Sequence, residues 1–131
     1  MTTTAWTESD LAEIDRHDEV HIAPRRSDGA LAALRTVWAV RVGSKVYIRS
    51  VNGAAGAWYR TASASHEGHL TSSGIASDVV FAVVDPTDAL QDRIDAAYRS
   101  KYNRYPGPVA RITADKARAT TFEILPEGTS S

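Results

Sequence analysis

The sequence predicts a small α+β barrel. About six segments have the β-branched and aromatic composition of strands, and two or three others have helical spacing or capping residues. No linker or internal repeat divides the 131 residues, a length that suits one domain with a sizeable core. We therefore expect a single domain over residues 1–131, with residues 1–5 and 127–131 disordered.

The composition excludes several kinds of site. The chain contains no cysteine, which rules out disulfides, zinc–thiolate sites, iron–sulfur clusters and thiol catalysis. Its net charge is −1, from 15 Lys and Arg against 16 Asp and Glu, which argues against a nucleic-acid partner. The longest apolar run is too short to cross a bilayer, and no secretory signal is visible, so we expect no membrane association and a cytoplasmic location.

The first half of the chain predicts a helix and three strands. Thr7–Arg16 has Thr7 or Ser9 as a possible cap and acidic residues at its start, as helices favour. Glu19–Arg25 alternates as a strand does, and its proline indicates an edge or a strand end. Thr36–Val42 and Lys45–Ser50 are the clearest strands, and the Gly-Ser pair between them fits a two-residue hairpin loop.

That hairpin predicts which side chains share a face. With a two-residue loop, Val40 lies opposite Tyr47 and Trp38 lies opposite Arg49. We expect these four side chains to form a groove or an oligomer interface. The alternate residues of the two strands should then fill the barrel interior.

The second half predicts two further helices, three strands and one short helical turn. The expected helices are Gly56–Ala64 and a longer one that begins at Asp85-Pro86 and ends near Tyr102. Pro106-Gly107-Pro108 should break the chain, with a helical turn in Val109–Lys116. The expected strands are Gly68–Ser72, Ile75–Val84, whose second half should be covered on both faces, and Arg118–Leu125.

The loop Ser50–Gly56 is the main candidate for a binding site. Glycine-rich loops expose backbone N–H groups that can hold an anion, although a plain strand-to-helix connection has the same composition. Arginine pairs with phosphate, and tryptophan and tyrosine can stack on a flat ring. The candidate ligand-binding residues in and beside the loop are Arg49, Ser50, Asn52, Gly53, Trp58, Tyr59 and Arg60.

Other polar groups are weaker candidates. Tyr98 and Tyr102, at the end of the long helix, could contact a substrate or simply cap the barrel. His66 and His69 are three apart, and on a strand they point to opposite faces, so we expect no metal site. No acid, base or nucleophile stands in a recognisable catalytic motif, and the catalytic residues stay unknown.

With these residues in view, the chain resembles the split-barrel proteins that bind FMN or the deazaflavin F420, and the F420-dependent nitroreductases in particular. The matching segments are R-R-S-D-G at Arg25–Gly29, Arg35, the Val37–Ser50 hairpin, S-V-N-G at Ser50–Gly53 and W-Y-R at Trp58–Arg60. The whole chain also resembles the bacterial domain-of-unknown-function family 2255.

The resemblance implies a six-stranded split barrel with two or three helices. It also implies a cofactor, F420 or FMN, whose phosphate meets Arg35 and the Ser50–Gly53 backbone. Three positions depart from the pattern, because Asp28 is inserted in the turn, Val51 replaces a basic residue and Arg60 replaces an asparagine.

Three functions remain open at this point. The first is an oxidoreductase that transfers hydride from F420 or FMN to a small organic substrate, with the cofactor supplying the redox chemistry. The second is a cofactor-free split barrel that binds a small molecule and acts as an isomerase or cyclase. The third is a non-catalytic interaction protein that forms a homodimer through Trp38 and Tyr47.

Overall fold

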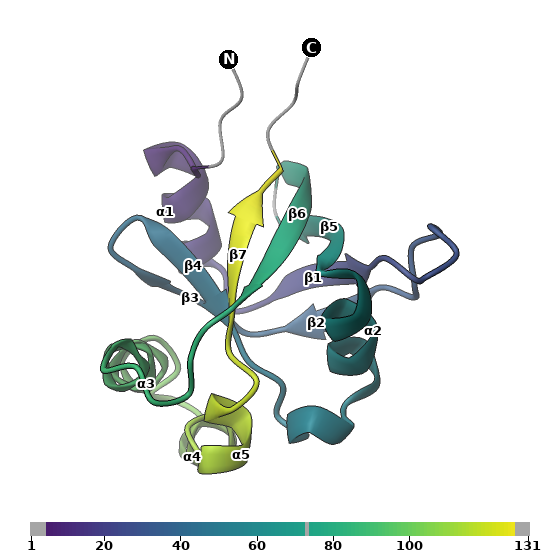
Figure 1. The fold of residues 1–131 in the computed structure, drawn as a ribbon. Coiled ribbons are helices and arrows are strands. Elements are labelled where there is room, and N and C mark those ends of the chain that lie inside the picture. Colours follow the sequence, from purple (N-terminus) through teal and green to yellow (C-terminus); the bar gives the residue numbers. More distant parts are fainter. Residues whose placement is uncertain (1–4, 73, 128–131) are drawn as a thin grey trace.

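The computed structural model describes residues 5–72 and 74–127, which form a curved antiparallel sheet surrounded by helices (Figure 1). The sheet has seven strands in the order β2-β1-β5-β6-β7-β4-β3. These strands are β1 (Val20–Pro24), β2 (Arg35–Val37), β3 (Ala39–Val42), β4 (Lys45–Ile48), β5 (Glu67–Ser72), β6 (Ile75–Val83) and β7 (Phe122–Pro126). The helices are α1 (Glu8–Arg16), α2 (Ala57–Ser65), α3 (Leu90–Lys101), α4 (Pro106–Ile112), α5 (Asp115–Arg118) and the short 3₁₀ segment η1 (Gly53–Ala55).

The sheet nearly closes into a barrel because one stretch of chain joins its two ends. β2 and β3 lie at opposite ends of the strand order, yet only Trp38 separates them in sequence. Val37 pairs with Val20 of β1, whereas Ala39 pairs with Ile48 of β4. The prediction of one continuous strand over Thr36–Val42 is therefore wrong, and this break accounts for seven strands in place of six. The α+β barrel itself is confirmed.

The β3–β4 hairpin has the predicted register. Val40 pairs with Tyr47, and Gly43 in the connecting turn has a φ of +63°, which favours glycine. As expected, the alternate side chains of the hairpin belong to the barrel interior: Val37, Ala39, Val46 and Ile48.

The opposite face of the hairpin is covered by the chain itself. Val40 is 1% exposed and Tyr47 is 2% exposed, and both pack in a second core with Ile94 and Tyr98 of α3. The expectation of an open groove or oligomer interface is wrong for Val40 and Tyr47, because α3 and α4 cover them. Trp38 and Arg49, at the other end of this face, border a cavity. Tyr47 is therefore not available for the proposed homodimer contact, and a homodimer stays a prediction.

Three helix boundaries show what sequence patterns can and cannot predict. α1 begins as predicted, with the Thr7 Oγ1 accepting the Asp10 N–H at 3.1 Å. α3 begins later than predicted, because the carboxylates of Asp85 and Asp88 accept nearby N–H groups and form turns ahead of the helix. The Pro106–Pro108 segment, predicted as a break, starts α4, since proline fits the first helical turn.

The last strands also differ in detail from the prediction. β6 lies in the middle of the sheet, but Val83 near its end is 65% exposed, so that end is covered on one face only. β7 begins at Phe122 because α5 and a turn precede it. The Glu127 N–H donates to the Asp78 carbonyl at 2.8 Å, which continues the pairing of this end of β7 with β6. Residues 1–4 and 128–131 lie outside the described part of the chain.

Lys101, the last residue of α3, has an inward-facing amine. Its Nζ donates to the carbonyls of Ala39 at 2.6 Å and Ile14 at 3.0 Å, which ties α3 to β3 and α1. Burial lowers the pKa of Lys101 from 10.5 to about 8, and the nearby carboxylates of Asp15 and Asp18 only partly oppose this shift.

The lowered pKa predicts a dependence of stability on pH. Between about pH 8 and 10.5 the unfolded chain holds a proton on Lys101 that the folded chain has released, so the free energy of unfolding should rise with pH. Burial raises the pKa values of Tyr98 and Tyr102, which act in the opposite direction once exposed tyrosines ionise above about pH 10. Urea unfolding between about pH 7.5 and 9.5 should show the rise in the native sequence and not in Lys101→Met.

Candidate functional site

A cavity of about 410 Å³ opens where the chain breaks at Trp38. The end of β2, the loop after β4, the start of α2 and the helix α4 surround it. Its size is within the range of small-molecule pockets. The lining residues are Glu19, Arg35, Thr36, Val37, Trp38, Arg49, Ser50, Val51, Asn52, Gly56, Ala57, Trp58, Pro108, Arg111 and Ile112.

Trp38 is held firmly at the edge of the cavity. Its carbonyl accepts the Tyr98 hydroxyl at 2.9 Å. Its ring stacks on Tyr102, with centroids 3.9 Å apart and planes 4° from parallel. The indole is thus a fixed part of the wall, and Trp58 contributes a second indole from α2.

The loop after β4 is locked by its own polar groups. Ser50 is 1% exposed, its N–H donates to the Thr120 Oγ1 at 2.9 Å, and its hydroxyl donates to the Gly53 carbonyl at 2.9 Å. The Gly53 N–H in turn donates to the Ser50 carbonyl at 3.0 Å. The groups of Ser50 and Gly53 that we expected to hold phosphate are therefore already used, partly within the loop and partly by Thr120.

The N-terminus of α2 provides the free donors instead. The first hydrogen bond of this helix runs from the Arg60 N–H to the Gly56 carbonyl, so the amides of Ala57, Trp58 and Tyr59 precede the helical ladder. Gly56 provides no side-chain cap, and Gly56, Ala57 and Trp58 all line the cavity. The positive end of the helix thus borders the cavity.

A side chain at position 56 would obstruct this arrangement. A Cβ on Gly56 would lie 2.6 Å from the Ser50 Oγ, in the middle of the loop's internal hydrogen bonds. The glycine therefore lets the loop and the helix start approach each other closely at the cavity wall.

Two exposed arginines supply positive charge at the cavity. Arg35 comes from β2 and Arg111 from α4, and neither forms an ion pair with an acidic residue in the described ranges 5–72 and 74–127. Glu19, before β1, adds one carboxylate to the lining. The cavity thus combines two available guanidinium groups with a helix N-terminus.

Arg49 lines the cavity but differs from these two arginines. Its guanidinium is fully buried and pairs with the carboxylate of Asp95. Its remaining N–H groups donate to Thr121, Gln91 and the Ile112 carbonyl. Because every donor is used, Arg49 supports the wall and has no N–H left for a ligand.

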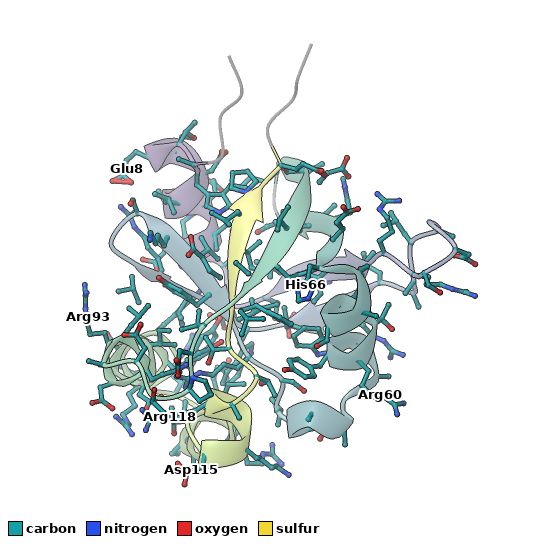
Figure 2. All side chains as sticks on the ribbon, in the orientation of Figure 1. Glu8, Arg60, His66, Arg93, Asp115 and Arg118 are labelled. Carbon is teal, nitrogen blue, oxygen red and sulfur yellow. The ribbon has the colours of Figure 1, made fainter. Side chains whose placement is uncertain are left out.

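The remaining predicted site residues lie away from the cavity. Arg60 extends from the outer side of α2 (Figure 2), and Tyr59 stacks on Phe122 with centroids 5.2 Å apart. Tyr98 and Tyr102 are fully buried, and their hydroxyls donate to backbone carbonyls. These two tyrosines therefore belong to the core and have no access to a substrate in the cavity.

The structure thus brings together part of the predicted site and adds to it. Arg35, Arg49, Ser50, Asn52 and Trp58 line the cavity, whereas Gly53, Tyr59 and Arg60 do not. Glu19 and Arg111 are the additions that sequence reasoning missed. Arg111 could have been noticed only by reading Pro106 as the first residue of a helix.

Neither a metal cluster nor a membrane-spanning helix is found in the described part of the chain. Within the described ranges, no three His, Asp or Glu side chains gather closely enough to hold a metal ion. The helices of those same ranges are all too short or too polar to cross a bilayer.

A family model described as "Uncharacterized protein conserved in bacteria (DUF2255)" matches residues 10–124. The chain belongs to this family. A search of curated protein sequences finds no match to this DUF2255 chain.

Solved structures similar to the DUF2255 chain share its fold at low identity. The heme storage protein HutZ from Vibrio cholerae has a TM-score of 0.67 and 8% identity, covering 95% of this chain and 91% of that one. An F420 reductase has a TM-score of 0.54 and 19% identity, covering 95% and 97%. The FAD and heme binding protein from Mycobacterium smegmatis has a TM-score of 0.53 and 18% identity, covering 92% and 66%. The predicted split-barrel class is confirmed.

Proposed function

We propose that this chain binds F420 or FMN in the cavity at Trp38 and acts as an oxidoreductase on a small organic substrate. When bound, such a cofactor would supply a hydride to the substrate. The contribution of the chain would be to bind the cofactor's phosphate, orient its ring and keep water away from it. The observation that carries the proposal is the pairing of two available arginines with an uncapped helix N-terminus around one cavity.

The charges of the cavity suit a phosphorylated ligand. Arg35 and Arg111 come from different elements and could approach an anion from two directions. The amides at the start of α2 can donate to phosphate oxygens, as helix N-termini commonly do. Among the described residues of the lining, Glu19 is the one acidic side chain, and it is outnumbered by the positive groups.

The aromatic groups of the cavity suit a flat ring. Trp38 and Trp58 present indole surface to the same space, and stacking on an aromatic side chain is a usual way to hold a planar ligand. The rigidity of Trp38 means that little freedom is lost when a ring packs against it.

The lining favours a flavin-type cofactor over heme. Heme iron is usually held by His, Cys, Met or Tyr, and none of these is among the described residues that line the cavity. A flavin or deazaflavin needs no such ligand. This argument concerns the residues of this chain and does not depend on what its structural neighbours bind.

Fluorescence titration of purified protein with FMN and with F420 tests the proposal. We expect saturable binding of at least one of them, and Arg35→Ala should weaken it by about 1–3 kcal/mol, or about 5- to 150-fold in Kd, because a charged hydrogen bond is lost. Arg60→Ala is the matched control, since Arg60 does not line the cavity and its side chain extends outward from α2 (Figure 2).

Failure of cofactor binding would favour one of the two alternative functions, the cofactor-free small-molecule protein or the homodimeric interaction protein. If neither cofactor binds and native mass spectrometry finds another organic ligand, the cofactor-free reading replaces this one. If Arg35→Ala and Arg60→Ala bind equally well, Arg35 has no part in the site. A homodimer, which no contact described above supports, would be detected in the same native spectra.

A further inference from the structure

Lys101 occupies an unusual position for a lysine. Most lysines keep their ammonium in water, whereas this one donates to two backbone carbonyls, those of Ala39 and Ile14. Its Nζ also lies 5.2 Å from the centroid of the Tyr102 ring. The amine is therefore fixed in one orientation by α1, β3 and α3.

A second cavity has Lys101 in its wall. It has a volume of about 400 Å³ and is lined by Asp15, Val40, Arg41, Ala97, Ser100 and Lys101. It is separate from the cavity at Trp38, with which it shares no lining residue. Arg41 is already held by the Glu8 carboxylate at 2.6 and 2.8 Å, so Lys101 is the chemically available nitrogen of this cavity.

The contacts of Lys101 suit a neutral amine. A neutral amine has two N–H groups, which match the two carbonyl acceptors, and its lone pair then lies on the side that neither carbonyl occupies. The pKa of about 8 makes this form abundant at mildly alkaline pH. Asp15 and Asp18 are the carboxylates that act on the charged form, and both favour keeping the proton.

We propose that Lys101 is an acylation site for small acyl phosphates. The amine nitrogen attacks the acyl carbon and forms an amide N–C bond, while the C–O bond to phosphate breaks and phosphate leaves with the electron pair. The proton released from nitrogen goes to water or to the Asp15 carboxylate at the cavity wall. No oxidant or reductant is needed.

Acylation would change the contacts that support Trp38. The amide product keeps one N–H where the amine had two, so the carbonyl of either Ala39 or Ile14 loses the hydrogen bond from Lys101. The Ala39 carbonyl also accepts the Tyr102 hydroxyl at 3.1 Å, and Tyr102 stacks on Trp38. Acylation of Lys101 would thus alter contacts that run through Ala39 and Tyr102 to Trp38, which lines the first cavity.

Acetyl phosphate labelling of the folded protein at pH 8 tests the proposal. The chain has only three lysines, so Lys45 and Lys116, both exposed, serve as internal controls. At pH 8 the fraction in the neutral, nucleophilic form is about 100-fold larger for an amine of pKa 8 than for an ordinary lysine. A less basic amine is also a weaker nucleophile, and by analogy with thiols this lowers the expected rate advantage by about tenfold. We expect Lys101 to be acetylated about tenfold faster than the other two, as measured by peptide mass spectrometry.

Two controls make the result decisive. In urea the three lysines should react at similar rates, which would attribute the difference to the fold. In Lys101→Arg the rates at Lys45 and Lys116 should stay unchanged. If Lys101 in the folded protein reacts no faster than the two controls, the proposal is wrong. The experiment uses ligand-free protein, so its outcome is independent of cofactor binding.

Discussion

Replacing Arg49 with methionine is expected to lower the free energy of unfolding by about 3–5 kcal/mol, the usual cost of breaking a buried ion pair. The guanidinium is fully buried, and all five of its N–H groups have acceptors, which include the carboxylate of Asp95 and the side chains of Gln91 and Thr121. Methionine would leave the Asp95 carboxylate without its main partner in the core. Urea unfolding, followed by the midpoint concentration, measures the loss.

The size of this effect can be separated from the general cost of changing an arginine. Arg93→Met on α3 removes an arginine that points outward (Figure 2), and we expect a change of less than about 0.5 kcal/mol. The double variant Arg49→Met/Asp95→Leu should recover much of the loss, because both charges are then gone from the core. Equal stability of Arg49→Met and Arg93→Met would show that the buried pair contributes little.

A single methyl group at Gly68 is expected to destabilise the barrel by about 1–3 kcal/mol, the usual cost of overpacking a core. A Cβ there would lie 2.8 Å from both the Ala23 carbonyl oxygen and the Phe81 ring, and 3.0 Å from the Pro24 Cα. Two of these three neighbours are backbone atoms of the paired strand, which can move little. Thermal or urea unfolding of Gly68→Ala measures the loss.

The same substitution at Gly107 provides the matched control. Nothing lies within 4 Å of a Cβ at this position, which is in the first turn of α4. Gly107→Ala should change stability by less than about 1 kcal/mol, because the gain from restricting the unfolded chain is offset by the strain that Pro108 places on a preceding helical residue with a Cβ. Destabilisation of similar size at both glycines would mean that close packing is not the cause at Gly68.

The local patterns in the sequence predicted most of the elements. Alternation and a Gly-Ser turn were enough for the β3–β4 register, because pairing next to a two-residue loop is decided by neighbouring residues. The capping threonine likewise predicted the start of α1. The break at Trp38 could not be predicted in this way, because it depends on β1 and β4, which pair with the two halves of that segment.

Only the site residues that belong to short sequence motifs could be predicted. Arg35 and Trp58 follow from the resemblance, and both line the cavity. The role of Arg49 could not be read from its strand, because its acceptors come from Gln91, Asp95, Ile112 and Thr121, far along the chain. Arg111 reaches the cavity for a similar reason, since the position of α4 depends on tertiary packing.

The position of β7 has a consequence for how the protein is made. This last strand lies between β6 and β4, so Phe122–Pro126 joins two parts of the sheet that have no other pairing with each other. A chain still emerging from the ribosome lacks this bridge until β7 has been synthesised. Closure of the barrel must therefore wait for Phe122–Pro126, and until then the edges of β4 and β6 stay open to chaperones or to unwanted partners.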